Sequence, residues 1–251
     1  MLTAAQIHHY PTPLVVCTAY DAAYASILEQ AGVDIILVGD SLANVVLGLS
    51  STRDIGMTEM EIFSAAVLRG ARNTHVTVDL PYGAYADSTV ALQNARRLMT
   101  LGASSVKLEG VEVDVIRALR ADGIPVMGHL GVLQQTALSF KRVGQSLDDR
   151  DRLISEARAL EDAGVFAVVL ENVEAETAHT ITESLTVPTI GIGAGDGTRG
   201  QVQVLHDLLG LVEKSPPFAK PFASLRNEAK IAAENYAKAV RSGNLNEPKP
   251  V

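Results

Sequence analysis

The stretch Asp34-Ile35-Ile36-Leu37-Val38-Gly39-Asp40-Ser41 decides how this chain folds. Four apolar residues, 35–38, run without a polar break. A run this short that contains Val and Ile is typical of a strand covered on both faces. The strand stops at a glycine that a carboxylate follows. A buried strand that ends in an ionisable side chain is therefore the unit to look for along the chain.

The same unit recurs four more times. Each recurrence is a short run rich in apolar residues, and the runs end in Asp79, Glu109, His129 and Glu171. If these strands are parallel and adjacent, their last residues meet Asp40 at one end of the sheet. This convergence is the main functional signal in the sequence.

Helical patterns separate the strands along the whole chain. Eight strand–helix alternations in 251 residues predict an α/β fold, the (β/α)8 TIM barrel. No shift of composition marks a boundary, so residues 1–251 are predicted to form one barrel domain with a short N-terminal arm and a C-terminal helix over 224–241. Besides the opening stretch, strands are expected at 14–19, 76–79, 105–109, 125–129, 165–171, 188–192 and 202–205.

Composition narrows the class of partner and the compartment. The formal net charge is −8, and the chain has no basic run, which argues against nucleic acid or an anionic membrane as partner. Cys17 is the single cysteine, so no internal disulfide can form, and a reducing, cytoplasmic location is expected. No apolar run reaches transmembrane length, and the first residues lack a signal-peptide pattern.

Three carboxylates end neighbouring strands of the predicted barrel: Asp40, Asp79 and Glu109. Adjacent strands lie about 4.8 Å apart, and acids this close repel one another unless they are protonated or hold a cation. Oxygen ligands favour a hard ion such as Mg²⁺. The alternative is that an acid at a strand end caps the following helix. Three of them on consecutive strands favour the metal site.

Lys107 precedes Glu109 by two residues, so both face the same side of their strand. A lysine that points into a barrel beside carboxylates is costly unless it is paired. It could hold a substrate carboxylate, or it could form a structural ion pair with Glu109, and the two roles are compatible.

Two further residues are candidates for proton transfer. Glu171 ends the sixth strand, away from the three acids, and an acid placed apart from a metal suits a general base. A surface helix cap is the alternative. His129 could be an acid, a base or a hydrogen-bond donor, although a lone histidine is more often structural. The glycine run over 191–195 is typical either of a phosphate-binding loop or of tight packing.

Seven motifs in the expected order together resemble the ketopantoate hydroxymethyltransferase (3-methyl-2-oxobutanoate hydroxymethyltransferase) family. They span nearly the whole chain, and they are specific as a set although each alone is weak. The motifs are Thr18-Ala19-Tyr20-Asp21, Val38-Gly39-Asp40-Ser41-Leu42, Asp79-Leu80-Pro81-Tyr82, Val106-Lys107-Leu108-Glu109-Gly110, Gly128-His129-Leu130-Gly131, Leu170-Glu171 and Gly191-Ile192-Gly193-Ala194-Gly195.

The resemblance implies a barrel enzyme of the phosphoenolpyruvate mutase and isocitrate lyase superfamily. It implies transfer of a hydroxymethyl group from 5,10-methylenetetrahydrofolate to 3-methyl-2-oxobutanoate, which gives 2-dehydropantoate for pantothenate biosynthesis. It also implies a homo-oligomer, commonly a decamer. The implied roles are Mg²⁺ binding at Asp40 and Asp79 with Glu109 near the metal through water, substrate binding at Asp40, Ser41, Asp79, Lys107 and His129, and proton abstraction by Glu171.

Four loops at the predicted catalytic face differ from the usual sequence of the family, although the residues implied to bind the metal and the keto acid are kept. The resemblance therefore does not decide whether the chain binds folate or what its second substrate is. The runner-up is another Mg²⁺-dependent C–C bond lyase or aldolase that acts on a 2-oxo acid. A non-catalytic paralogue is disfavoured because all the acids are present. The departing stretches are Gly48-Leu49-Ser50-Ser51-Thr52, Leu133-Gln134-Gln135 (usually Thr-Pro-Gln), 139–145 and Arg199-Gly200-Gln201.

Overall fold

The computed structural model describes residues 1–137 and 141–243. It divides into two compact units, Met1–Val204 and Leu205–Val251, which we describe separately. The single domain expected over 1–251 stays a prediction. Of the departing stretch 139–145, residues 139 and 140 lie outside the described residues.

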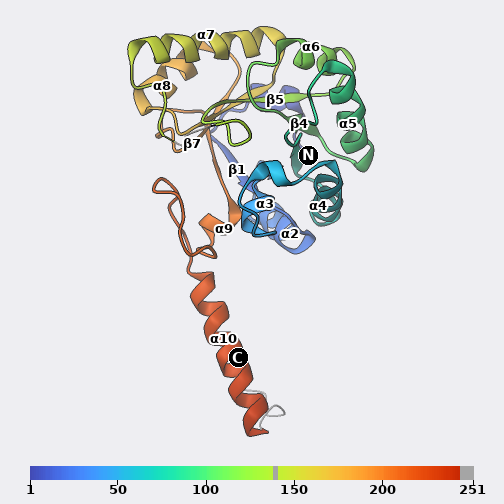
Figure 1. The fold of residues 1–251 in the computed structure, drawn as a ribbon, viewed down its shortest axis with the longest axis vertical. Helices are drawn as coiled ribbons and strands as arrows, with labels where there is room; N and C mark the ends of the chain where they lie inside the picture. The colour runs from blue at the N-terminus through green and yellow to red at the C-terminus, as the bar shows by residue number, and fades with distance from the viewer. Residues whose placement is uncertain (138–140, 244–251) are drawn as a thin grey trace. The chain divides into compact units, whose positions relative to one another are not determined.

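The first unit is a closed barrel of eight parallel strands in sequence order (Figure 1). The predicted (β/α)8 fold is therefore confirmed. The strands are β1 (Leu14–Thr18), β2 (Ile35–Val38), β3 (His75–Asp79), β4 (Ser105–Lys107), β5 (Val126–Gly131), β6 (Ala167–Glu171), β7 (Thr189–Ile192) and β8 (Gly200–Gln203).

Helices alternate with these strands and cover them. Their starts follow local rules: the Asp21 carboxylate accepts from the Tyr24 amide, and Asp87 accepts from the Thr89 and Val90 amides. The helices of this unit are α1 (Ala4–His8), α2 (Ala22–Gln30), α3 (Leu42–Val45), α4 (Met57–Gly70), α5 (Ser88–Leu101), α6 (Val113–Ala121), α7 (Leu147–Ala163) and α8 (Ala175–Ser184).

The segment 41–54, which follows β2, contains two short helices. These are α3 and the 3-10 turn η1 (Thr52–Asp54). The Ser51 hydroxyl accepts from the Arg53 amide and starts the turn. Such single turns are too short to show helical periodicity in a sequence, which is why the segment reads as irregular.

Alternate strand residues point into the barrel and form its core. Since successive side chains of a strand alternate in direction, the second residue after a core residue also faces inward. This rule places His129 after Met127 and Glu171 after Val169, at the carboxyl ends of their strands. The core cluster comprises Ile7, Leu14, Val16, Ile35, Leu37, Met127, Phe166, Ala167, Val169, Ile190 and Val202.

A buried polar chain lies earlier along the same inward rows. His75 donates to or accepts from the Ser105 hydroxyl at 2.9 Å, and its other ring nitrogen lies 2.9 Å from the Leu2 carbonyl. The Thr77 and Ser105 hydroxyls are 2.8 Å apart. Burial lowers the pKa of His75, so a neutral ring joins the N-terminal arm to the barrel interior.

Gly131 lets β5 approach β6 closely beside Glu171. Its φ is +102°, and a Cβ there would lie 2.2 Å from the Glu171 carbonyl oxygen. We expect Gly131→Ala to lower the free energy of unfolding, because backbone atoms cannot move aside as a flexible side chain can. Chemical denaturation measures the loss.

Gly123→Ala is the matched control. Gly123 also has a positive φ, +79°, but a Cβ there meets nothing within 4 Å. The control carries the backbone strain alone, so Gly131→Ala should cost roughly 1–3 kcal/mol more. Equal losses in the two variants would show that the contact with β6 has no energetic weight.

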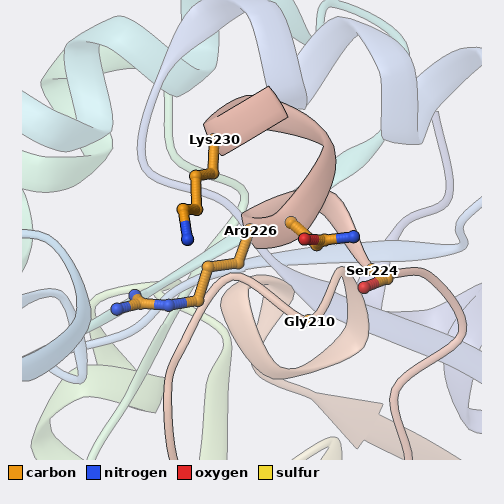
Figure 2. A pocket seen from close by; sticks show the side chains of 5 residues that line it. Gly210, Ser224, Arg226 and Lys230 are labelled. Atoms are coloured by element: carbon orange, nitrogen blue, oxygen red, sulfur yellow. The ribbon is translucent and has the colours of Figure 1, made fainter. Parts of the chain in front are cut away.

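The second unit contains α9 (Leu205–Leu208) and α10 (Leu225–Ser242). A hollow within it is lined by Gly210, Ser224, Arg226, Asn227 and Lys230 (Figure 2). Arg226 also donates to the Leu211 carbonyl at 3.3 Å. None of the predicted site residues lines this hollow. Within the described ranges, no helix combines the length and apolarity needed to span a bilayer.

Candidate active site

The predicted site residues gather at the carboxyl ends of β2 to β6. Asp79 and Lys107 are register partners on β3 and β4, and Gly131 pairs with Glu171 on β5 and β6. Partners in a parallel ladder point the same way, so the polar ends of neighbouring strands face one another. Asp40, Asp79, Lys107, Glu109 and His129 are all at most 5% exposed.

Asp79 lies at the centre of a group of buried charged side chains that includes Asp40 and Lys107. One carboxylate oxygen accepts from Lys107 Nζ at 2.8 Å, and the other accepts from the Asp40 amide at 3.0 Å. Lys107 thus forms an ion pair with Asp79, whereas the sequence suggested Glu109 as its structural partner. Burial disfavours the Lys107 ammonium, but the negative charges of Asp79, Asp40 and Glu109 together outweigh burial, and the pKa of Lys107 is raised.

Asp40 is buried close to Asp79, Glu109 and the positively charged Lys107. Burial, and then the nearby charge of Asp79, raise the pKa of Asp40 to about 7. Its Oδ2 accepts from Gln135 Nε2 at 2.8 Å. These partners are not the first turn of a helix, so the helix-cap alternative does not describe Asp40 or Asp79.

His129 bridges two acids that were expected to stand apart. Its Nδ1 lies 3.4 Å from Glu109 Oε1, and its Nε2 lies 3.3 Å from Glu171 Oε2. Burial lowers the pKa of His129, but interactions with Glu109 and Glu171 outweigh burial and raise it to about 9. Glu171 is therefore connected to Glu109 through the ring of His129.

Ser41 follows Asp40 and contacts a buried tyrosine. The Tyr20 and Ser41 hydroxyl oxygens are 2.8 Å apart. Burial raises the pKa of Tyr20, so its phenol stays protonated. A protonated phenol can hold the Ser41 hydroxyl in one orientation at the barrel mouth.

Two neighbouring glutamines of the loop after β5 belong to the site and were not predicted. Gln134 Nε2 donates to Glu171 Oε1. Gln135 contacts Asp40 and Glu109. The sequence predicts only that this polar loop lies over the barrel mouth. Its departure from the usual Thr-Pro-Gln was the one available signal.

The glycine run after β7 packs closely against its surroundings. A Cβ on Gly191 would lie 2.8 Å from Thr198 Oγ1, and one on Gly195 would lie 2.8 Å from the Ala175 Cβ. Gln201 Nε2 donates to the Gly195 carbonyl at 2.9 Å. These contacts account for the small residues by tight packing.

The side chains available as ligands fit Mg²⁺ better than a metal ion that takes all of its ligands from the protein. No three His, Cys, Asp or Glu side chains of the described residues converge as a ready-made site. Mg²⁺ needs only one or two carboxylates, since waters and substrate oxygens complete its shell. Asp40 and Asp79, adjacent and buried, supply such a pair.

A family model described as ketopantoate hydroxymethyltransferase matches residues 2–248. The chain belongs to the ketopantoate hydroxymethyltransferase family. A 3-methyl-2-oxobutanoate hydroxymethyltransferase of Rippkaea orientalis is 48% identical over 238 residues, which cover 92% of this chain and 93% of that protein. The family and the enzyme class predicted from the sequence are confirmed.

Solved structures share the ketopantoate hydroxymethyltransferase barrel. 2,3-Dimethylmalate lyase, a member of the PEP mutase/isocitrate lyase superfamily, is similar with a TM-score of 0.64 and 18% identity, covering 100% of this chain and 92% of that chain. Phosphonopyruvate hydrolase in complex with oxalate and Mg²⁺ has a TM-score of 0.67 and 13% identity, covering 99% and 92%. At these identities the likeness concerns the fold.

Proposed function

We propose that this chain transfers a hydroxymethyl group from 5,10-methylenetetrahydrofolate to 3-methyl-2-oxobutanoate and releases 2-dehydropantoate. The observation that carries the proposal is the meeting of buried acids and one buried lysine at the mouth of a barrel of this family. The direct test is product formation from both substrates with added Mg²⁺. If no product forms from the two substrates in the presence of Mg²⁺, the assignment is overturned.

Asp40 and Asp79 would hold Mg²⁺, with Glu109 near it through water. When bound, Mg²⁺ polarises the keto group of a chelating 2-oxo acid and stabilises the charge of the enolate. The complex of phosphonopyruvate hydrolase with oxalate and Mg²⁺ supports this, because oxalate presents paired oxygens as a 2-oxo acid does.

The remaining side chains orient the substrate and move its proton. Lys107 binds the substrate carboxylate, and Ser41 and His129 contribute further contacts. Glu171 takes the proton from C3, and the enolate carbon then attacks the one-carbon unit. Water supplies the oxygen of the new hydroxymethyl group, and tetrahydrofolate leaves. His129, protonated between Glu109 and Glu171, helps keep the base aligned with the substrate.

A Lys107→Met variant tests the substrate-binding role. An ammonium has three N–H donors, so Lys107 can hold Asp79 and a substrate carboxylate together. Losing a hydrogen bond to a charged group costs about 1.5–3 kcal/mol, so keto-acid affinity should fall tenfold to a hundredfold. Calorimetry should show a much smaller change in Mg²⁺ affinity. Equal losses for the two ligands would indicate a structural lysine.

A lyase or aldolase on a 2-oxo acid is the second candidate. The observation that favours it is Gln134, which lies in an altered loop and contacts Glu171. Assays with one keto acid and either methylenetetrahydrofolate or free aldehydes separate the two. Turnover with aldehydes alone would favour the second candidate.

We also propose that the enzyme is a homo-oligomer, a decamer by resemblance, in the cytoplasm. The acidic net charge of −8 and the single cysteine support a soluble protein of a reducing compartment. Light scattering measures the mass in solution, and a monomer would contradict the proposed assembly.

A further inference from the structure

Gln135 uses every one of its polar groups, although it lies in a loop. It is 1% exposed. Its backbone N–H and both side-chain N–H donors make hydrogen bonds, and both of its oxygens accept them. A loop glutamine whose three N–H donors and two oxygens are all engaged is held in one orientation.

The three N–H groups of Gln135 point toward Asp40, Glu109 and the backbone next to Asp79. Its Nε2 donates to Asp40 Oδ2 at 2.8 Å and to the Leu80 carbonyl at 3.1 Å. Its backbone N–H donates to Glu109 Oε2 at 3.0 Å. One residue of the β5 loop therefore fixes two carboxylates that follow β2 and β4.

Two other loops fix Gln135 in turn. The Tyr85 hydroxyl donates to Gln135 Oε1 at 2.5 Å, which leaves the amide nitrogen facing Asp40. Arg53 Nε donates to the Gln135 carbonyl, and its guanidinium lies 5.2 Å from the centre of the Tyr82 ring. The loops after β2, β3 and β5 thus meet on a single residue, Gln135.

We propose that Gln135 is a positioning residue for metal binding: it sets the orientation of the Asp40 and Glu109 carboxylates, and Tyr85 and Arg53 hold it in place. The inference rests on the proposed Mg²⁺ role of Asp40. The donated hydrogen bond occupies Oδ2 of Asp40 and directs the carboxylate toward one rotamer. Partners of this kind typically change metal affinity by about 10–100-fold when removed.

The test measures Mg²⁺ affinity by calorimetry on the metal-free full chain, beside thermal unfolding. Gln135→Met keeps the length of the side chain and removes its polar atoms, and the Mg²⁺ Kd should rise about tenfold or more. Tyr85→Phe removes one hydroxyl and should raise the Kd by a smaller factor. Thr136→Val is the control, because Thr136 is the next residue of the same loop and its side chain is exposed, and the Mg²⁺ Kd of this variant should not change.

The outcomes separate positioning from stability. A folded Gln135→Met protein with unchanged Mg²⁺ Kd overturns the inference, even if it melts earlier. If that variant does not fold, Tyr85→Phe decides, and an unchanged Kd there overturns it. If Asp40→Ala itself leaves the Kd unchanged, the proposed metal assignment fails, and that failure is distinct from a failure at Gln135.

Discussion

Asp40→Ala is expected to abolish Mg²⁺ binding. Asp40 is 5% exposed and its amide donates to Asp79, so the two acids form one buried oxygen pair. With a single carboxylate left, and Lys107 ion-paired to it, the ion loses half of its protein ligands. The Mg²⁺ affinity should fall by more than the roughly 100-fold that follows removal of a residue that only hydrogen-bonds to a metal ligand. Calorimetry on the metal-free protein measures it.

Asp87→Ala is the matched control for this experiment. Asp87 also follows a barrel strand, but its carboxylate caps α5 by accepting from two backbone amides. Removing it should cost about 1 kcal/mol of stability and leave the Mg²⁺ affinity intact. Unchanged affinity in Asp40→Ala would remove the metal assignment.

Glu171→Gln is expected to stop enolisation while both ligands still bind. The substitution keeps the size of the side chain and removes its basicity. The exchange of the C3 proton of 3-methyl-2-oxobutanoate with deuterated water should fall about 100-fold or more, the usual scale for a lost general base. Exchange needs no folate, so the result holds whatever the second substrate is.

Glu174→Gln provides the comparison for the base. Glu174 lies three residues further on, its side chain is 39% exposed, and it pairs with Arg142 at 3.7 Å. The Glu174→Gln variant should exchange the C3 proton at the same rate as the unmodified enzyme. Near-normal exchange in Glu171→Gln would exclude Glu171 as the base, and His129, whose Nε2 lies 3.3 Å from Glu171, could replace it only in its neutral form.

The barrel and the acids at its strand ends follow from patterns that are local in sequence. Short apolar runs that end in Asp40, Asp79 or Glu171 predict parallel strands, and parallel strands bring their last residues together. The register between neighbouring strands cannot be read from these local patterns. Pairing of β3 with β4 sets Asp79 beside Lys107, and that is why the lysine contacts this acid instead of Glu109.

The parts of the site that were missed depend on loop packing. Gln135 reaches Asp40 across 95 residues of sequence, and Tyr85 reaches Gln135 across 50. No periodicity marks such contacts, since each loop conformation depends on the others. His129 was named as a candidate, but its place between Glu109 and Glu171 needed the angular position of β5 in the barrel.

The loop after β5 has a consequence for evolution and for engineering. Gln134 touches the acid on β6, and Gln135 touches the acids that follow β2 and β4. Substitutions that adapt this loop to a new co-substrate therefore also disturb proton transfer and metal binding. Their effects should be strongly non-additive. An attempt to engineer the preference for the one-carbon donor would therefore meet epistasis in this loop first.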